Sequence, residues 1–213
     1  MTILDGKKTS EALKQEIAEE VKQLKDQGKK VPHLAAVLVG DDGASLTYVG
    51  SKVKACEQVG FASTLVKLPA DISEEKLLQE IAKLNTNPEI DGYIVQLPLP
   101  KHINEQKILL AIDPTKDVDG FHPANFGRMA LDMEAFIPAT PFGIMELLKR
   151  YKVPTQGKHV VVVGRSHIVG RPISILLSQK GAQGNATVTL THSHTPNLAD
   201  LTRQADIVVM ALG

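Results

Sequence analysis

Tyr48 and Lys52 are the first residues of this chain whose types and spacing suggest chemistry. They stand four positions apart in the stretch LTYVGSKVKA, and on a helix this spacing places both side chains on one face. A lysine held neutral in a dry pocket can exchange protons near neutral pH, and a tyrosine ring offers a flat substrate a surface for stacking. An ordinary surface helix has the same spacing, so the pair alone does not decide between the two interpretations.

The chain from His33 to Gln96 alternates between strand and helix patterns. This βαβαβ order predicts a parallel sheet with helices on its faces. An amphipathic helix with Ser10 as its cap and Gly28 as its end is expected before the sheet. The predicted strands are 33–39, 62–68 and 92–96. The helix between the first two strands carries Tyr48 and Lys52, and the helix between the second and third follows the capping box Asp71-x-x-Glu74.

Gln96 stands at the end of the third predicted strand. In parallel sheets covered by helices, ligands bind at the carboxyl ends of the strands. The following residues, Leu-Pro-Leu-Pro, contain too much proline to continue a central strand. Gln96 is therefore expected at the mouth of a binding site, and a polar strand end that faces water is the open alternative.

The stretch KDVDGFH, residues 116–122, combines two carboxylates, a glycine and a histidine without a helix or strand pattern. Its Asp-x-Asp-Gly order is similar to the start of a calcium-binding loop. A calcium loop is excluded, because glycine follows Asp119 directly and Arg128 stands where the bidentate glutamate is required. A binding segment and a plain turn both remain as interpretations.

Another unit made of a strand, a turn and a helix begins at His159. Four valines run into the turn GRSHIVGRP, which starts at Gly164, and an apolar helix follows. Such a unit holds the pyrophosphate of a dinucleotide with backbone N–H groups and the helix dipole. Ser166 replaces the second glycine of the usual fingerprint.

The next predicted strand, 186–191, indicates which dinucleotide is bound. It ends in His192-Ser-His-Thr, where a NAD-selective site has an acidic residue for the ribose 2′-hydroxyl. A hydroxyl group and imidazoles, with Arg165 nearby, suit a 2′-phosphate instead. The sequence therefore predicts NADP rather than NAD.

The length of 213 residues favours two domains. Thr140 is the expected cap of a helix that starts with Pro141 and runs to about residue 151. A helix over 197–204 and a strand over 207–210 complete one mononucleotide-binding half. A whole dinucleotide fold has two such halves, so the second domain is expected to be incomplete.

The composition narrows the class of partner. The 24 basic and 24 acidic residues balance and form no long run of one sign, which favours a small-molecule ligand over nucleic acid or a membrane surface. The start carries no apolar leader and no apolar stretch of membrane-spanning length follows, so a soluble, cytoplasmic protein is expected. Cys56 is the single cysteine, which excludes an internal disulfide framework and indicates a packing role; no metal site is expected.

Together these motifs resemble the bifunctional methylenetetrahydrofolate dehydrogenase/cyclohydrolase family. The resemblance covers the whole chain, and the ordered matches make chance similarity implausible. The matching stretches are 48–55, 95–100, 116–122, 138–143, 164–172 and 192–195.

The resemblance implies an α/β fold with an N-terminal parallel βαβ catalytic domain, 1–139, which binds folate, and a Rossmann-like NADP-binding domain, 140–213. It implies that Tyr48 stacks on the folate ring system, that Lys52 is the general acid and base, that Gln96 orients and tunes Lys52, and that Asp119 hydrogen-bonds the pterin edge. It further implies a homodimer formed through the nucleotide-binding domains. The residues implied to hold NADP are Gly164, Arg165, Ser166 and Ser193.

The implied chemistry belongs to one-carbon metabolism. Hydride leaves methylenetetrahydrofolate for the nicotinamide, and water then attacks the methenyl cation to give 10-formyltetrahydrofolate. Two departures from the family pattern matter: Ala139 stands where the family commonly has cysteine, and the chain ends at Gly213. If the molecule ends there, the nicotinamide subsite is expected to be incomplete and the dehydrogenase activity to be lost first.

Two other functions compete with this interpretation. A short-chain dehydrogenase also uses a Tyr-x-x-x-Lys pair, but its glycine-rich turn precedes the pair, whereas here the turn at Gly164 lies far downstream of Tyr48. The second alternative is a truncated relative that binds folate or NADP without turnover. Measuring ligand binding separately from turnover distinguishes such a binding protein from the enzyme.

Overall fold

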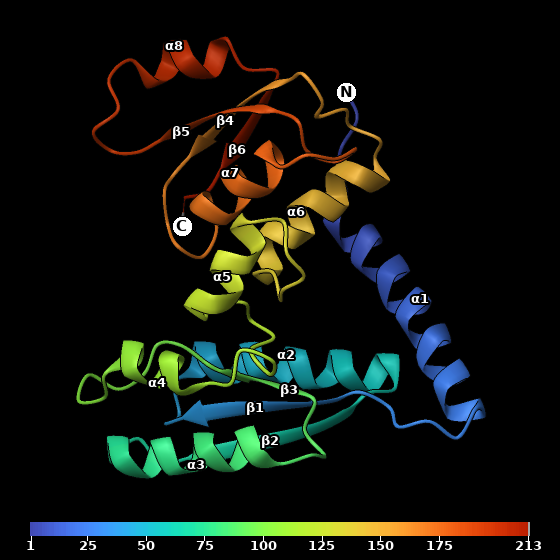
Figure 1. Ribbon diagram of the computed structural model, residues 1–213, viewed down its shortest axis with the longest axis vertical. Coiled ribbons are helices and arrows are strands. Elements are labelled where there is room, and N and C mark those ends of the chain that lie inside the picture. The colour runs from blue at the N-terminus through green and yellow to red at the C-terminus, as the bar shows by residue number, and fades with distance from the viewer. Residues whose placement is uncertain (213) are drawn as a thin grey trace. The chain divides into compact units, whose positions relative to one another are not determined.

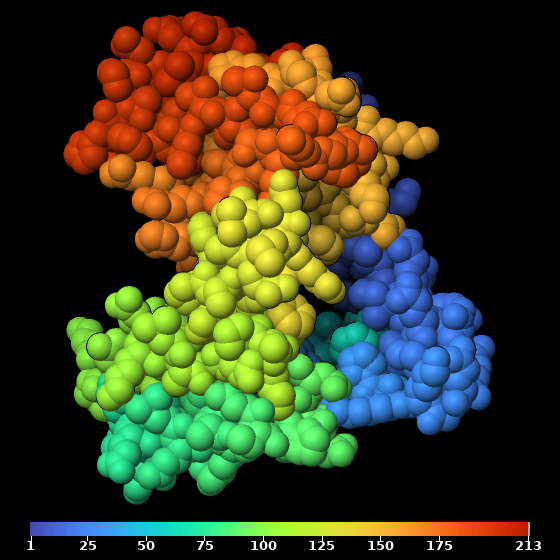
Figure 2. Space-filling view, viewed as in Figure 1, coloured from blue at the N-terminus to red at the C-terminus, as the bar shows by residue number. Residues whose placement is uncertain are grey.

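The computed structural model describes residues 1–212; Gly213, the last residue of the predicted second domain, lies outside the described part. The chain forms two compact units (Figure 1). The N-terminal unit is Lys7–Val118, and the C-terminal unit is Met1–Gly6 together with Asp119–Gly213. Figure 2 shows the surfaces of the two units in the same colours, with yellow to red for most of the C-terminal unit.

The N-terminal unit contains a three-stranded parallel sheet, as the sequence predicts, and its strand order is β2-β1-β3. The predicted bounds of the first two strands are confirmed, and the third ends one residue before Gln96. The strands are β1 (His33–Val39), β2 (Ala62–Leu68) and β3 (Gly92–Val95), and the helices are α1 (Gly6–Asp26), α2 (Gly43–Val59), α3 (Glu74–Thr86) and α4 (Glu105–Ala111).

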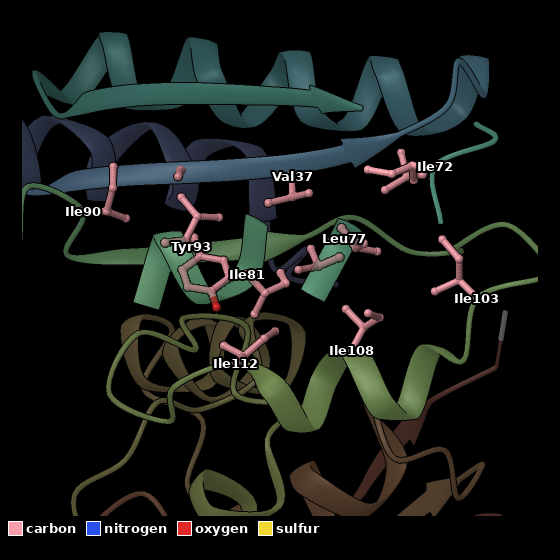
Figure 3. Packing of buried hydrophobic residues seen from close by; sticks show 13 residues of the cluster. Val37, Ile72, Leu77, Ile81, Ile90, Tyr93, Ile103, Ile108 and Ile112 are labelled. Atoms are coloured by element: carbon pink, nitrogen blue, oxygen red, sulfur yellow. The ribbon is translucent and has the colours of Figure 1, made fainter. Parts of the chain in front are cut away.

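Both faces of this sheet are covered, and the alternation of side chains along the strands decides which helix each residue meets. On one face, Val49 of α2 packs against Leu38 and Ile94. On the other face, Val37 and Tyr93 pack against α3 and α4 (Figure 3). Burial on both sides explains why β1 is a continuous apolar run rather than an alternating pattern.

Two predicted helix starts in this unit are wrong. α1 begins at Gly6, so Ser10 lies inside the helix rather than at its cap. α3 is capped by Ser73, whose side chain accepts a hydrogen bond from the N–H of Lys76, and not by the predicted box from Asp71. Ser73 directly precedes the first helical residue and is therefore better placed for capping.

The C-terminal unit contains a second three-stranded parallel sheet in the order β5-β4-β6. One face of β4, with Val160 and Val162, packs against Ile173 and Leu177 of the helix that follows. The strands are β4 (His159–Val163), β5 (Thr187–Thr191) and β6 (Ile207–Met210), and the helices are α5 (Pro123–Ala130), α6 (Ala139–Arg150), α7 (Gly170–Ser178) and α8 (Leu198–Arg203). The β4–α7–β5–α8–β6 order is the predicted mononucleotide-binding half.

The predicted cap of α6 is also wrong. The helix begins at Ala139 with Pro138 at the cap position, so Thr140 and Pro141 both lie in its first turn. The first turn tolerates proline because its N–H groups have no partner within the helix. None of the helices in residues 1–212 combines the length and the apolar character that crossing a membrane requires.

The first sheet is tied at the start of β1 by a His–Asp pair. The backbone N–H of His33 donates to Oδ2 of Asp91 at 2.8 Å, and the N–H of Asp91 returns a bond to the carbonyl of His33 at 3.0 Å. Nε2 of His33 lies 2.8 Å from the Thr64 hydroxyl on β2. Asp91 directly precedes β3, so the pair joins the starts of β1 and β3.

The second sheet repeats this arrangement. The N–H of His159 donates to Oδ2 of Asp206 at 2.9 Å, Asp206 returns its own N–H to the His159 carbonyl, and the His159 ring lies 2.9 Å from the Thr189 hydroxyl. Nζ of Lys158 also donates to Asp206, at 3.1 Å. The two sheets therefore begin with the same set of contacts.

Acid should weaken this arrangement through Asp206. The N–H of His159, and after it the Lys158 ammonium, lower the pKa of the Asp206 carboxyl. A carboxyl with a lowered pKa stabilises the fold above the ordinary aspartate pKa of about 3.9 and loses that contribution as the pH falls through its folded value. We expect Asp206→Asn to lower stability modestly at pH 7 and to lose less further stability between pH 5 and pH 2 than the wild type loses.

Urea unfolding at several pH values measures this difference. Asp200→Asn is the control, since the Asp200 carboxylate pairs within α8 with Arg203, and both side chains of this pair are exposed. If Asp206→Asn and the wild type lose the same free energy of unfolding between pH 5 and pH 2, the prediction is wrong.

Candidate functional site

Helix α2 carries the predicted Tyr48 and Lys52, and both of its ends are fixed. The Asp42 carboxylate accepts the N–H of Ser45 at 2.8 Å, and this bond lowers the pKa of Asp42. Gly60 ends the helix in the left-handed conformation, with φ of 80°. These caps and the buried Val49 hold α2 on the sheet.

Tyr48 and Lys52 lie together on one face of α2, as their spacing predicts. Nζ of Lys52 is 5.0 Å from the centroid of the Tyr48 ring, the geometry of a cation–π contact. Lys52 is partly buried, and Tyr48 is 60% exposed. The ring therefore has free surface on which a flat ligand could stack beside the amine.

Gln96 extends the ladder of β3 beyond its last residue, because its N–H donates to the Val37 carbonyl at 2.9 Å. Its side-chain Nε2 donates to the carbonyl of Leu97 at 2.7 Å. Oε1 is buried, and among residues 1–212 it has no hydrogen-bond partner. An unpaired buried acceptor is costly, so this oxygen points to a donor that comes from a ligand or a movable side chain.

Gln96 lies on the α2 side of the sheet. Side chains alternate along a strand, so Gln96 continues the face of Ile94. Ile94 packs in one cluster with Val49 and Val53, and Val53 is the neighbour of Lys52 in sequence. The side chains of Gln96, Tyr48 and Lys52 therefore belong to the same side of the N-terminal unit.

The segment before Asp119 is held against β3. The carbonyl of Lys116 accepts the N–H of Tyr93 at 2.9 Å, and Asp117 is buried. A side chain at Gly92 would overlap Val118, which itself packs in the Ile94 cluster. Asp119, partly buried, follows directly after this anchored segment.

Gly120 fixes the backbone on the other side of Asp119. It has φ of +67°, and a Cβ there would lie 2.7 Å from the carbonyl oxygen of Phe136. The sequence pattern assigns no role to Gly92 and marks Gly120 only as a member of the segment 116–122, although a glycine within a polar segment is a signal for a close approach of backbone. His122, also in that stretch, caps α5 by accepting the N–H of Ala124 at 3.1 Å.

Cys56 has the predicted packing role. It is 5% exposed within α2, and burial raises the pKa of its thiol. No group of three or more histidine, cysteine or acidic side chains in the described part of the chain could hold a metal ion.

The turn between β4 and α7 forms a narrow backbone cradle. Gly164 has φ of +113°, and a Cβ there would overlap the carbonyl of Ala211, while a Cβ at Gly170 would overlap the carbonyl of Gly164. The Ser166 hydroxyl accepts the N–H groups of Val169 at 3.1 Å and of Gly170 at 3.3 Å. Ser166 thus closes the turn in place of the usual second glycine.

This cradle fits the pyrophosphate of a dinucleotide. The backbone N–H groups of residues 165–168 donate to no protein acceptor within residues 1–212. Successive free N–H groups ahead of a helix bind anions without a cationic side chain. Gly164, Arg165 and Ser166 are the residues that would line such a phosphate.

The end of β5 lies beside the cradle. The N–H of Gly164 donates to the carbonyl of Thr191 at 3.0 Å. Arg165 directly follows the donor residue in sequence, and His192 directly follows the acceptor residue. Thr191 is fully buried, and its hydroxyl donates to the carbonyl of Val162 at 3.0 Å. Ser193 and Arg165 are exposed, which leaves both accessible to a ribose group.

Two family models match this chain. The catalytic domain of tetrahydrofolate dehydrogenase/cyclohydrolase matches residues 4–119, and the NAD(P)-binding domain of the same family matches residues 138–213. The chain is 71% identical over its 213 residues to the bifunctional protein FolD of Flavobacterium johnsoniae and covers 72% of that protein.

Solved structures agree with these matches. The structure is similar to the bifunctional FolD enzyme of Campylobacter jejuni, with 46% identity and a TM-score of 0.94 over the whole chain and 74% of that enzyme. It is also similar to the Trypanosoma brucei dehydrogenase-cyclohydrolase in complex with NADP and an inhibitor, with 38% identity and a TM-score of 0.91 over the whole chain and 72% of that enzyme.

Proposed function

This chain belongs to the tetrahydrofolate dehydrogenase/cyclohydrolase family, and from this membership and the geometry above we infer which of its residues carry the chemistry. The protein is a bifunctional enzyme. It oxidises 5,10-methylenetetrahydrofolate to 5,10-methenyltetrahydrofolate with NADP and hydrolyses the product to 10-formyltetrahydrofolate. The observation that carries the residue assignment is the Tyr48–Lys52 contact on the same side of the sheet as the unpaired acceptor of Gln96.

Lys52 is proposed to move the proton in the hydrolytic step. A neutral amine takes a proton from the water whose oxygen bonds to the methenyl carbon. The ammonium then returns that proton to the ring nitrogen as its bond to carbon breaks, and the hydroxyl of the adduct releases its remaining proton to solvent as the formyl C=O forms. The positive charge of the methenyl group disfavours a second positive charge on Lys52, and this favours the neutral amine that the step needs.

The other predicted residues are proposed to position the substrate. Tyr48 offers its exposed ring to the flat pterin, and Asp119 accepts hydrogen bonds from the pterin edge. The unpaired oxygen of Gln96 is an acceptor for the Lys52 amine and would hold it toward the reacting carbon.

NADP supplies the acceptor carbon for the hydride. Gly164 and Ser166 are proposed to hold its pyrophosphate through the backbone of the cradle, and Arg165 and Ser193 its 2′-phosphate. The support is the set of N–H groups without protein acceptors and the two glycines that admit no side chain. The alignment of the two carbons by binding is the main contribution of the protein to hydride transfer.

Gln96→Leu tests the role of the amide. We expect hydrolysis to fall by roughly 10- to 100-fold, because a hydrogen bond to a charged group contributes about 1.5–3 kcal/mol. The free energy of unfolding should fall by about 1 kcal/mol, since the variant loses the bond from Nε2 to the Leu97 carbonyl, whereas the buried Oε1 has no partner to lose among residues 1–212. Steady-state hydrolysis and urea unfolding measure the two effects, and unchanged hydrolysis in a folded variant would reject the assignment.

We also propose a catalytic domain over residues 1–139, a coenzyme domain over 140–213, and a cytoplasmic homodimer formed through the coenzyme domains. The start of the second family match at residue 138 supports the boundary, and family membership supports the dimer. The single buried Cys56 suits a reducing compartment. Sedimentation equilibrium tests the dimer, and cell fractionation tests the compartment.

The first experiment is an assay of both activities on the 213-residue chain. NADP reduction with methylenetetrahydrofolate reports the dehydrogenase, and loss of methenyltetrahydrofolate above its uncatalysed rate reports the cyclohydrolase. Both activities are expected of the enzyme, and hydrolysis without NADP reduction would show that these 213 residues hold the Lys52 site but an incomplete nicotinamide subsite. A folded protein that binds folate and NADP but turns over neither substrate would instead be a binding protein.

A further inference from the structure

The side chain of Lys116 ties the segment that leads to Asp119 to the end of helix α3. Nζ of Lys116 donates to the carbonyl of Leu84 at 3.0 Å and to the carbonyl of Asn87 at 2.6 Å. Leu84 lies in the last turn of α3 and Asn87 is its C-terminal cap, where a helix leaves carbonyl groups without their usual partners within the helix. A lysine there also meets the negative end of the helix dipole. The contact therefore depends on the charge of Lys116.

The main chain of Lys116 is held to the sheet at the same time. Its carbonyl accepts the N–H of Tyr93 at 2.9 Å, and Tyr93 is fully buried in β3. The next residue, Asp117, forms a parallel bridge to Tyr93. Because its side chain binds α3 and its carbonyl binds β3, Lys116 fixes both the place and the direction of the chain three residues before Asp119.

Asn85 of α3 holds the start of the same segment. Its Nδ2 donates to the carbonyl of Ala111 at 2.8 Å. Its Oδ1 accepts the hydroxyl of Tyr93 at 2.6 Å and the N–H of Asp113 at 2.9 Å. The segment is therefore bound to α3 at two places, at its start through Asn85 and near its end through Lys116.

We propose that Lys116 is a positioning residue for the folate substrate: by fastening the segment to α3 and β3, it holds Asp119 where the carboxylate accepts the hydrogen bonds of the pterin edge. This inference rests on the proposed role of Asp119 and adds to it the residue that fixes its backbone. Lys116 itself does not touch the substrate and acts only through Asp119. Loosening the segment weakens binding, because only the fraction of molecules with Asp119 in place can use this contact.

The experiment is a double-mutant cycle on the whole chain with Lys116→Met and Asp119→Ala. The measured quantity is the affinity for 5-formyltetrahydrofolate, a stable folate that has the pterin edge of the substrate. We expect Asp119→Ala to lower the affinity by roughly 10- to 100-fold, the effect of losing bonds to a charged group, and Lys116→Met by about 3- to 10-fold. In the Asp119→Ala background, Lys116→Met should lower the affinity by less than about twofold further, because no carboxylate remains to be positioned.

Two further variants separate positioning from the stability of α3. Lys83→Met removes a charge from the same last turn of α3, where Lys83 is exposed and pairs with Glu80, and should leave the folate affinity unchanged. Lys116→Arg keeps a cation that can donate to the carbonyls and should recover most of the affinity. Hydrolysis by Lys116→Met should show a higher KM with kcat within about twofold of the wild type, because Lys52 keeps its proton chemistry.

The outcomes distinguish this inference from the proposed function. Lys116 lies outside the buried apolar cluster of its unit, so Lys116→Met should fold, and urea unfolding checks this. An equal loss of affinity from Lys116→Met in the wild type and in Asp119→Ala, or no loss in either, would overturn the positioning role and leave the folate site standing. If Asp119→Ala binds the folate as tightly as the wild type, the proposed role of Asp119 fails, and this inference fails with it.

Discussion

Replacement of Lys52 by methionine is expected to lower hydrolysis of methenyltetrahydrofolate by about 10²- to 10⁴-fold, the range that a positioned acid or base contributes. Methionine keeps much of the length of the lysine side chain but cannot accept or donate the proton. The Tyr48 ring remains, so binding of methenyltetrahydrofolate should weaken only a little. Hydrolysis rates and equilibrium titration with a non-hydrolysable folate analogue measure the two effects separately.

Lys54→Met is the matched control for this variant. Lys54 stands two residues further along α2, on a different side of the helix, and is exposed. Its substitution removes the same charge from the same helix and should leave both hydrolysis and folate binding near their original values. If Lys52→Met hydrolyses as fast as Lys54→Met, Lys52 is not the proton carrier.

The second large effect is expected from Gly170→Ala at the start of α7. A Cβ at this position would overlap the carbonyl of Gly164, so the turn that forms the cradle must open. We expect the affinity for NADP to fall about 100-fold or more, because two or more bonds to the pyrophosphate, each contributing about 1.5–3 kcal/mol, lose their geometry. Overpacking should also lower the free energy of unfolding by about 1–3 kcal/mol.

Gly127→Ala provides the comparison for Gly170→Ala. Gly127 lies within α5, and a Cβ there has no atom within 4 Å. Alanine should stabilise this helix by about 0.5–1 kcal/mol and leave NADP binding unchanged. Calorimetry and thermal unfolding of the two variants compare the sites, and NADP binding by Gly170→Ala with unchanged affinity would show that the cradle does not hold the pyrophosphate.

β1, β3 and β4 were predictable because they are largely buried runs of apolar residues, and β2, which has no fully buried residue, because of its place in the alternation of strands and helices. β1, β2, β4 and β6 have the predicted bounds, and their parallel pairing follows from the helices between them. The two short helices α4 and α5 were not predicted. Each had a signal in the sequence, since Asn104 caps α4 and Pro123 occupies the first position of α5 after the cap His122. Short helices give too few turns for an apolar period to stand out.

Contacts of the site between residues close in sequence were predictable, and contacts that depend on the packing of distant segments were not. The contact of Tyr48 with Lys52 follows from one helix, so the spacing alone is sufficient. The burial of Gln96 Oε1 depends on how residues far apart in sequence enclose the end of β3. The need for glycine likewise depends on residues distant in sequence, the Val118 side chain at Gly92 and the backbone of residues 136–138 at Gly120, which no sequence period reports.

The matching His–Asp pairs have a consequence for how each sheet comes apart. The histidine that starts the central strand bonds the aspartate that directly precedes one edge strand, across 58 residues in one unit and 47 in the other. Its ring contacts a threonine hydroxyl of the other edge strand, Thr64 or Thr189, so this histidine joins the starts of all three strands only when the whole sheet is assembled. Loss of either edge strand removes a partner of this one histidine, and we therefore expect the sheet to come apart as a single cooperative event rather than by fraying.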